Sequence, residues 1–218
     1  MTDAYNSQVG QDKFVLNIMK RKENGFFLEI GSNHPKKINN SYILEKQYNW
    51  TGIMVEYESK WLPQYKTQRP NSIHIINDAT KIDYKKLFED NNVPLNVDYL
   101  QIDLEVCNGS TLRTLERVDS DVMDTYKFAT VTFEHDIYRG DYIDTRNTSR
   151  AIFEKRGYVR VFSDICDRTP SYAFEDWYVH PDLVDMDYVN TLIENNLKNN
   201  KPAKITNTTI NWQKISYH

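Results

Sequence analysis

Glycine is scarce in this chain: only 7 of its 218 residues are glycine, and they form no run. A loop that wraps a pyrophosphate group needs closely spaced glycines, because side chains would hold the backbone away from the phosphates. The scarcity therefore argues against NAD, ATP and other ligands bound through a glycine-rich phosphate loop. Cysteine is scarcer still, and Cys107 and Cys166 alone suggest neither a disulfide framework nor a zinc site.

The chain also lacks a concentration of positive charge and a long apolar segment. Its 27 basic and 31 acidic residues give a net charge of -4 without a basic block, which argues against nucleic-acid binding. No apolar run approaches the length of a membrane span, and the N-terminal residues lack the basic-then-apolar order of a signal peptide. We therefore expect no membrane insertion and a cytoplasmic location.

Strand-like segments alternate with helix-like segments along most of the chain. Apolar residues recur at helical spacing or form short runs rich in β-branched and aromatic residues. The expected strands are 26–30, 52–56, 72–77, 97–104, 128–133, 158–163 and 177–179, and the expected helices are 12–21, 40–47, 59–66, 84–90, 109–118 and 149–156.

This alternation predicts a Rossmann-like α/β fold with a mostly parallel central sheet and helices on both faces. Late strands joined without a long helix predict an antiparallel edge strand. The length suits a single domain. Within it we expect a helical cover over 1–24, a cofactor-binding core over 25–136, and a substrate-side region with the sheet edge over 137–218.

Acidic residues follow many of the predicted strands. In parallel α/β sheets, ligands bind beyond the carboxyl ends of the strands. Glu29 precedes Gly31 at the end of the first strand, and Glu56 ends the second, where an acid commonly binds ribose hydroxyls. This pair predicts an adenosine-bearing cofactor. The polar residues at the strand ends are Glu29, Glu56, Asp78, Asp103, Glu105, Glu134, His135 and Asp136.

The predicted cofactor-binding residues follow the first four strands. Asp78 is assigned to the adenine amino group, with a turn-capping role as the alternative. Asp103 ends the fourth strand, where the reacting group of the cofactor should lie. The full set is Glu29, Gly31, Ser32, Asn33, Glu56, Asp78, Ala79, Asp103 and Leu104.

Several of these segments, taken in order, resemble the FkbM-type methyltransferases. The similar segments are Ser-Gln-Val-Gly-Gln-Asp-Lys-Phe at 7–14, Phe-Leu-Glu-Ile-Gly at 27–31, Leu-Glu at 44–45, Trp-Thr-Gly-Ile at 50–53, Val-Glu at 55–56 and Asp-Leu-Glu at 103–105. The resemblance implies the Rossmann-like fold of class I methyltransferases and an S-adenosylmethionine-dependent O-methyltransferase that acts on a sugar or glycan. Related domains occur in large DNA viruses, so it also implies a viral protein acting in the host cytoplasm.

The scarcity of glycine suits S-adenosylmethionine, because this cofactor carries no phosphates. Two positions depart from the family pattern. Pro35 and its neighbours stand where the family often has a second glycine, and Val106 follows Glu105 where the family has a glycine. The sequence therefore does not determine the backbone conformation of either turn.

The residues after the fifth strand supply the candidate catalytic groups. Methyl transfer to a hydroxyl requires removal of its proton, and a histidine suits that task near neutral pH. We assign His135 as the general base, with Glu134 as its neighbouring acid and Asp103 as a further catalytic group. His34 and His180 are alternative bases. Transfer is expected to be direct and in line, with positioning as a large part of catalysis.

Asp103, Glu134 and Asp136 also form an alternative magnesium site, because hard cations prefer carboxylate oxygens. No contiguous metal-binding motif supports it, and the competing interpretation pairs these acids with Lys, Arg or backbone amides. The residues expected to bind the sugar or glycan acceptor are Glu105, Asp136, Tyr138, Arg139 and Trp177.

Two other classes of function compete with the enzyme. One is a non-catalytic cofactor- or glycan-binding module of the same fold, which the two departures from the family pattern favour. The other is a nucleotide-sugar enzyme, and the absence of a glycine-rich pyrophosphate turn argues against it.

Overall fold

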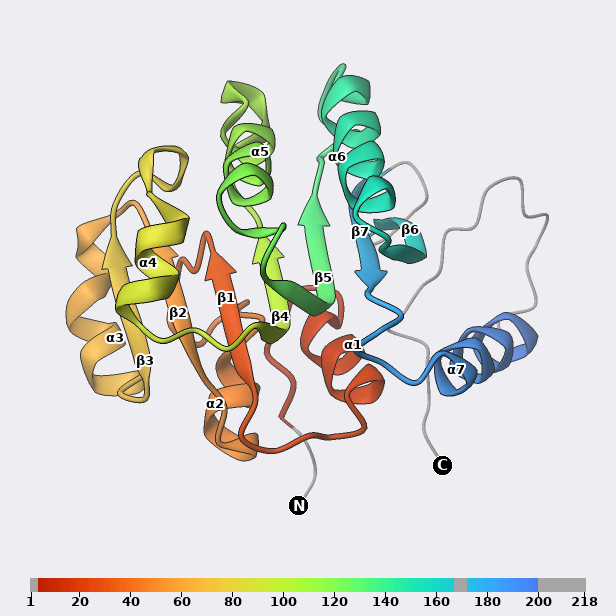
Figure 1. The fold of residues 1–218 in the computed structure, drawn as a ribbon, viewed down its shortest axis with the longest axis horizontal. Helices are drawn as coiled ribbons and strands as arrows, with labels where there is room; N and C mark the ends of the chain where they lie inside the picture. The colour runs from red at the N-terminus through yellow and green to blue at the C-terminus, as the bar shows by residue number, and fades with distance from the viewer. Residues whose placement is uncertain (1–3, 167–171, 200–218) are drawn as a thin grey trace.

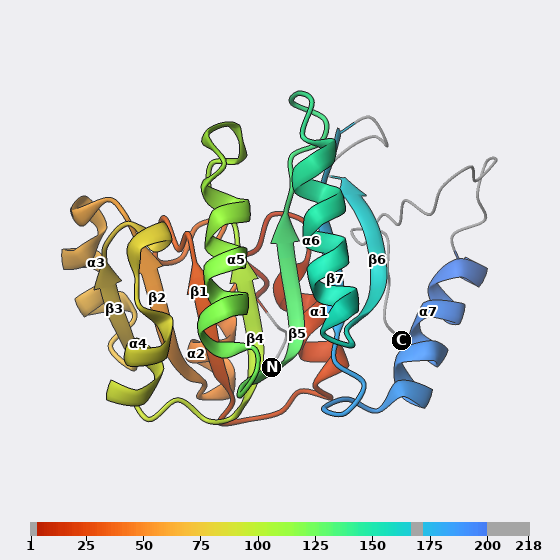
Figure 2. The same cartoon turned by 45° about the horizontal axis from the view of Figure 1, so that its top comes forward.

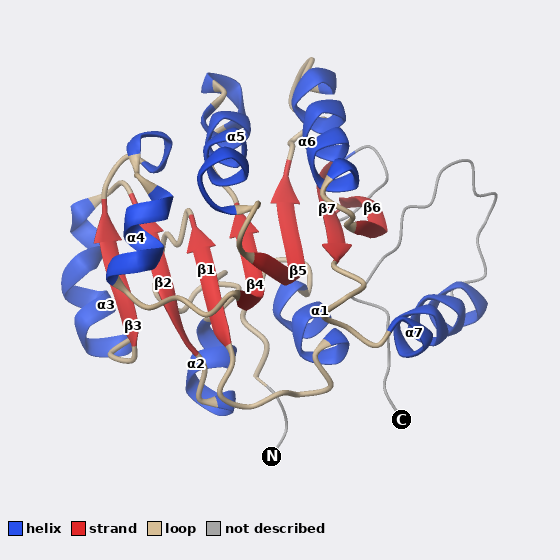
Figure 3. Ribbon diagram, in the orientation of Figure 1, coloured by secondary structure: helices blue, strands red, loops and turns tan. Residues whose placement is uncertain are grey.

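A seven-stranded sheet organises the molecule (Figure 1, Figure 3). The computed structural model describes residues 4–166 and 172–199. The strands lie in the order β3-β2-β1-β4-β5-β7-β6. They are β1 (Phe26–Ile30), β2 (Thr51–Glu56), β3 (Ser72–Ile76), β4 (Asn96–Ile102), β5 (Lys127–Glu134), β6 (Val159–Cys166) and β7 (Ala173–Val179).

Strand directions confirm the Rossmann-like fold with a mostly parallel sheet. β1 pairs in parallel with both β2 and β4, and β3 and β5 extend the parallel sheet on either side. β7 is antiparallel to both of its neighbours, β5 and β6. Only residues 167–172 separate β6 from β7, too few for the crossover that parallel strands require. The antiparallel strand therefore lies one place inside the edge, next to β6.

Helices cover both faces of the sheet, as Figure 2 shows. α4, α5 and α6 pack on one face, and α1, α2 and α3 on the other, with α7 joining the second group. The helices are α1 (Gln11–Ile18), α2 (Tyr42–Tyr48), α3 (Leu62–Gln68), α4 (Tyr84–Asp90), α5 (Ser110–Val122), α6 (Ile143–Lys155) and α7 (Met186–Asn199). No helix of the described residues is long and apolar enough to span a membrane.

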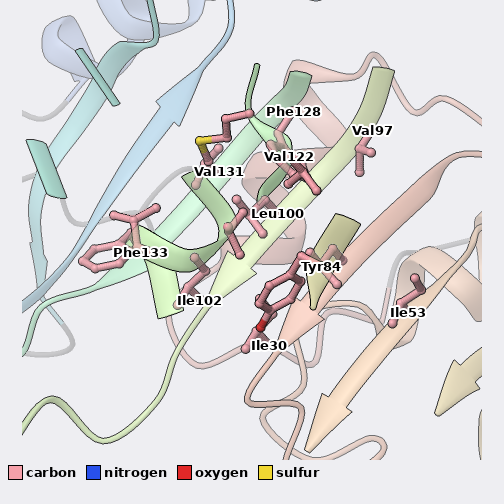
Figure 4. Packing of buried hydrophobic residues seen from close by; sticks show 14 of the residues in the cluster. Ile30, Ile53, Tyr84, Val97, Leu100, Ile102, Val122, Phe128, Val131 and Phe133 are labelled. Carbon is pink, nitrogen blue, oxygen red and sulfur yellow. The ribbon is translucent and has the colours of Figure 1, made fainter. Parts of the chain in front are cut away.

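Two apolar clusters fill the spaces between the sheet and its helices. Figure 4 shows one of them, in which Leu100 of β4 and Val131 of β5 pack with Val122 of α5. In the other, Phe14 of α1 lies 4.8 Å from Trp177 of β7, measured between ring centroids. Because side chains alternate between the faces of a strand, β1, β2, β3, β4 and β7 each contribute apolar residues to both clusters.

The sequence predictions differ from the structure mainly after residue 137. Helix α6 begins six residues before its predicted start, β7 is longer than the predicted segment, and α7 was not predicted. The first turns of α6 carry few apolar residues, so periodicity gave no signal there. Strand β7 contains Glu175 and Asp176, both buried, and their charge masked a strand that tertiary contacts stabilise.

A substitution at Gly52 tests how closely β1 and β2 approach each other. A Cβ atom at this position would lie 2.4 Å from the carbonyl oxygen of Phe27. We expect Gly52→Ala to lower the free energy of unfolding by roughly 1–3 kcal/mol, because the paired strands must move apart. Urea denaturation measures this loss, with Gly140→Ala as the control, since its Cβ would meet nothing nearer than 3.3 Å. Equal stability of the two variants would contradict the packing of these strands.

Candidate functional site

A cavity of about 820 Å³ opens at the carboxyl ends of β1, β2, β4 and β5. The chain leaves β1 toward α2 on one face of the sheet and leaves β4 toward α5 on the other. Adjacent strands whose connections diverge in this way leave a crevice between them, the usual ligand site of such sheets. Glu29, Gly31, Glu56, Asp103 and Glu134 all line this cavity, as the sequence predicted for the strand ends.

Gly31 lets the backbone after β1 pass close to the end of β4. Its φ is +88°, and a Cβ atom there would lie 1.8 Å from the carbonyl oxygen of Asp103. Any other residue would push the two strand ends apart and would be strained in this conformation. Ser32, Asn33 and Leu104 follow these strand ends and also line the cavity.

Glu29 holds the loop that follows β1 and does not lie free in the cavity. Its side chain is fully buried, and its carboxylate accepts hydrogen bonds from the amide of Asn39 and the backbone N–H of Ser41. Burial raises the pKa of Glu29, while the nearby charge of Arg69 opposes that rise. Glu29 is therefore a structural acid that closes the loop 31–41 over the strand end.

Arg69, at the end of α3, fixes the same loop from the other side. Its guanidinium donates to the carbonyl oxygen of Pro35, to Asn39 Oδ1, to Ser41 Oγ and to Glu45 Oε2. The side chains of Arg69 and Glu45 are both fully buried, and their ion pair measures 2.8 Å. Side-chain hydrogen bonds thus fix the conformation of this loop, at the place where the related family often has a second glycine.

Glu56 occupies the position expected for a ribose-binding acid. One carboxylate oxygen accepts from the backbone N–H of Asn33 at 2.7 Å, and the other accepts from that of Glu58 at 2.8 Å. A carboxylate offers about four lone-pair positions, so both oxygens keep capacity for a ligand. Beside it, Tyr57 is 74% exposed, and Trp61 packs edge-on against His34. All three aromatic side chains border the cavity.

Asp103 and Glu134 bring a pair of carboxyl groups into the cavity from β4 and β5. They follow the paired residues Ile102 and Phe133 of adjacent strands, so the two carboxyl groups lie side by side, and repulsion between two carboxylates favours a proton on one of them. Burial first, and then the neighbouring carboxylates, raise the pKa of both. Gln101 lies on the same face of β4, and its buried Oε1 has no hydrogen-bond partner among the described residues. A ligand N–H or O–H group would satisfy that oxygen.

His135 is not part of the cavity, which corrects the predicted general base. Strand alternation turns its ring to the opposite face from Glu134, where it is fully buried. Its Nδ1 accepts from the backbone N–H of Ile137, so Nε2 carries the proton and points to Asp164 and Asp176 at 3.5 and 3.6 Å. The nearby His135 ring and the hydrogen bonds from Arg150 lower the pKa of Asp176 despite its burial.

The atoms of His135, Asp164 and Asp176 converge within 4.8 Å, as metal ligands would. Arg150 pairs with both carboxylates, and Arg146 pairs with Asp164. Two guanidinium charges already balance the two carboxylates, so the cluster does not favour a further cation. Among the described residues no other three His, Cys, Asp or Glu side chains converge in this way, so the alternative metal site at Asp103, Glu134 and Asp136 is not assembled.

Trp177 and Asp78 also lie away from the cavity. Trp177 is fully buried between Phe14 and Phe162, and therefore cannot serve as a platform for an acceptor. Asp78 caps a short helical turn by accepting from Thr80, and this hydrogen bond lowers the pKa of Asp78. Ala79 is buried in the same turn. The turn-capping alternative thus describes Asp78, and neither residue borders the cavity.

A smaller cavity of about 230 Å³ adjoins the first. Glu105 and Arg139 border both, so the two spaces share a wall. Asp136 is nearly buried and pairs with Arg139 at 3.0 Å. Tyr142 and Cys107 complete the lining, and Tyr138 stands outside it, exposed and 5.5 Å from the ring of Tyr172. Three of the predicted acceptor residues therefore meet at one place.

Sequence patterns missed several residues of this site. Gln8 lines the cavity, and Gln11 of α1 donates to the buried Glu175 on β7. Both belong to the segment 7–14 that carried the family resemblance, and that resemblance was their only signal. Arg69 and Gln101 had none, because a single arginine after a helix and a glutamine inside a strand are ordinary in sequence.

Comparisons with known proteins agree with this architecture. No protein-family model and no curated protein sequence matches the chain. A protein described as an rRNA methylase from Clostridium thermocellum superposes with a TM-score of 0.52 at 11% identity, over 81% of this chain and 98% of its own. A TehB-like SAM-dependent methyltransferase from Corynebacterium glutamicum superposes with a TM-score of 0.50 at 9% identity, over 78% and 87%. The chain therefore has the Rossmann-like fold of SAM-dependent methyltransferases.

The buried ion pair of Arg69 and Glu45 should dominate the stability of the loop after β1. We expect Arg69→Met to lower the free energy of unfolding by about 3–5 kcal/mol, because it leaves Glu45 buried without its partner. Lys86→Met is the control: it removes the exposed pair with Asp90 and should leave the stability nearly unchanged, because surface ion pairs contribute little. Chemical denaturation of both variants measures the difference. Similar small losses would show that the loop does not depend on Arg69.

Proposed function

We propose that this protein is an S-adenosylmethionine-dependent O-methyltransferase that acts on a hydroxyl of a sugar or glycan. The observation that carries the proposal is the adjacent carboxyl groups of Asp103 and Glu134 in a cavity that Glu56 also lines. An adenosine-binding acid and a proton acceptor then face one space, at the switch point of a methyltransferase fold. The resemblance to the FkbM-type enzymes supports the same reaction and the same class of acceptor.

The residues present suit the proposed cofactor. Glu56 retains lone pairs for two ribose hydroxyls, and Gly31 clears the backbone at the strand end. The unpartnered Oε1 of Gln101 and the carboxyl groups beside it can accept hydrogen bonds from an ammonium group. When bound, S-adenosylmethionine supplies an electrophilic methyl group on a positively charged sulfur. A surplus of carboxylates in the cavity complements that charge.

Proton removal falls to the carboxyl pair in this proposal. The unprotonated oxygen of the pair accepts the proton of the acceptor hydroxyl as the hydroxyl oxygen attacks the methyl carbon. A carboxyl group with a raised pKa is a stronger base than an ordinary surface carboxylate, and it is better matched to neutral pH. Because the two groups lie side by side, they titrate together. Asp103 and Glu134 thus replace His135 in the base role.

The smaller cavity supports a polyol as the acceptor. Glu105 and Asp136 offer hydrogen-bond acceptors there, and Arg139 and Tyr142 offer donors, which suits hydroxyl groups that both donate and accept. The two cavities are also strongly acidic, which disfavours a polyanion such as RNA or DNA. Seven carboxyl groups, Glu29, Glu56, Glu58, Asp103, Glu105, Glu134 and Asp136, face three cations, Lys37, Lys60 and Arg139.

A non-catalytic binding module is the second candidate. Pro35 and its neighbours replace the glycine that the related enzymes often have, and Arg69 holds their loop rigidly. Thermal shift measurements with S-adenosylhomocysteine, NAD and a UDP-sugar separate the candidates. Stabilisation by the first ligand alone supports an S-adenosylmethionine site, and a methyl-transfer assay then distinguishes the enzyme from a cofactor-binding module. No stabilisation by any of them favours a glycan-binding module.

Glu56 should govern cofactor affinity. We expect Glu56→Gln to weaken S-adenosylhomocysteine binding about 10- to 100-fold, because charge-assisted hydrogen bonds contribute about 1.5–3 kcal/mol. Isothermal titration calorimetry measures the affinity. Glu58→Gln is the matched control, since Glu58 borders the same cavity but is half exposed and paired with Lys60. Equal affinity of Glu56→Gln and the parent protein would remove the ribose assignment.

Glu134 should govern turnover. We expect Glu134→Gln to reduce methyl transfer by about 10²- to 10⁴-fold while S-adenosylhomocysteine still binds. In the parent protein, turnover should rise as the pH is raised, because the raised pKa values keep the pair protonated at lower pH. Transfer of a radioactive methyl group to a panel of methyl glycosides measures both effects. His135→Gln serves as the comparison: if it abolishes transfer and Glu134→Gln does not, the base is misassigned.

A further inference from the structure

A third carboxyl group stands directly behind the pair of Asp103 and Glu134. Glu175 of β7 is the register partner of Glu134 on the antiparallel strand β5. Directly opposed residues of such strands project from the same face with their Cβ atoms about 4.5–5.5 Å apart. The three carboxyl groups therefore form one row across β4, β5 and β7, on the face that α1 covers. We call Asp103, Glu134 and Glu175 the carboxyl row.

The outer end of the carboxyl row is closed to water. Glu175 is only 2% exposed, and its Oε2 accepts from Gln11 Nε2 at 2.9 Å and from Trp177 Nε1 at 2.8 Å. Thr132 reaches the same carboxyl group and is also hydrogen-bonded to the hydroxyl of Tyr99, at 2.7 Å. Burial raises the pKa of Glu175 to about 8, with the charge of Asp103 adding to the rise.

Positive charge does not compensate the carboxyl row. Among the described residues, none of its three members forms an ion pair with a lysine or arginine. Of the cations that line the cavity, Arg139 is paired with Asp136 and Lys60 with Glu58. The charged or titratable groups around the row are Asp12 of α1, Glu29 of β1, Tyr99 of β4, Glu105 after β4, and Asp136 with Arg139 after β5.

Like charges this close cannot all be ionised without cost, so the row must retain protons or acquire a cation. Its inner end borders the cavity in which the proposed cofactor would bind. We propose that the carboxyl row holds a proton in the empty protein and releases it when the positive charge of S-adenosylmethionine enters the cavity. Glu175 is a positioning residue in this scheme, since it acts on Glu134 and does not border the cavity. The inference rests on the proposed function.

Release of this proton generates the catalytic base when the cofactor binds. The row loses one proton to solvent on cofactor binding and thereby gains a free carboxylate. During transfer, the oxygen–methyl bond forms as the methyl–sulfur bond breaks, and the electron pair of the broken bond stays on sulfur. The proton of the acceptor hydroxyl moves to the free carboxylate. Because the sulfonium charge is lost in the same step, the row returns to its original protonation state, and the cycle produces one proton in total.

The test compares ligands that differ in charge at the sulfur position. S-Adenosylmethionine and sinefungin, which carries an ammonium group there, are positively charged at this position, and S-adenosylhomocysteine is neutral. Calorimetric titrations near pH 6.8 in phosphate and in Tris give the number of protons released, after subtraction of the ionisation of each free ligand. We expect clear release with the two charged ligands and little with the neutral one. Their affinities should also rise with pH, by up to about tenfold per pH unit, while that of S-adenosylhomocysteine stays flat.

Two variants test whether the released proton comes from the carboxyl row. Glu175→Gln removes one carboxyl group, so the remaining pair binds its proton less tightly and the release should fall. Glu134→Gln, at a partly exposed position, should have the same effect if the buried variant does not fold. Glu89→Gln, at the surface of α4, is the control and should leave the release unchanged.

The possible failures are distinguishable. Equal proton release with the charged and neutral ligands would overturn the inference while leaving the proposed function intact. Release that persists undiminished in both Glu175→Gln and Glu134→Gln would overturn the assignment to this row. Absence of binding by all three ligands would overturn the proposed function, and the inference with it.

Discussion

The site depends on the buried ion pair of Arg69 with Glu45, because this pair fixes the loop 31–41, which has no glycine after Gly31. The guanidinium also binds the carbonyl oxygen of Pro35 and the side chains of Asn39 and Ser41, and Asn39 in turn binds Glu29. Loop, strand end and helix α3 therefore share one hydrogen-bond network. Burying an ion pair costs desolvation energy, which complementary hydrogen bonds must offset. The satisfied network meets that condition, and it holds the backbone of the loop beside the cavity without the conformational freedom of a glycine-rich turn.

The alternation of side chains along a strand divides the polar residues into two sets with different electrostatics. On the face toward α6, Asp164 and Asp176 are balanced by Arg146 and Arg150, and His135 is held between the acids. On the face toward α1, no lysine or arginine in the described part of the chain pairs with Asp103 or Glu134. Adjacent residues in sequence, Glu134 and His135, thus belong to unlike environments. The compensated set stabilises the packing of α6, and the uncompensated set keeps the proton affinity that chemistry can use.

Sequence patterns were sufficient for the sheet and for the strand-end acids, since both follow from short-range regularities. Apolar runs ending in Glu29 and Glu56 indicated two strand ends that border the cavity, because parallel strands present their carboxyl ends at one edge. Alternation along a strand decides toward which face of the sheet a side chain points. The sequence did not show that His135, one residue past the end of β5, points to the face opposite Glu134. Long-range partners had no local signal: Arg69 meets Glu45 across 24 residues, and Gln11 meets Glu175 across 164.

A cavity with an excess of buried carboxyl groups is costly to maintain, and an ordinary folding requirement would replace or neutralise them. Glu134 could pair with a lysine, or Glu175 could be apolar like its neighbour Phe174, with gain in stability. The excess is consistent with a reaction that consumes a positive charge. A carboxylate that faces a sulfonium is stabilised before methyl transfer and loses that stabilisation as the sulfur becomes neutral. Its proton affinity therefore rises during the same step in which the acceptor must give up a proton, so charge loss at sulfur and proton uptake at the carboxyl group favour each other.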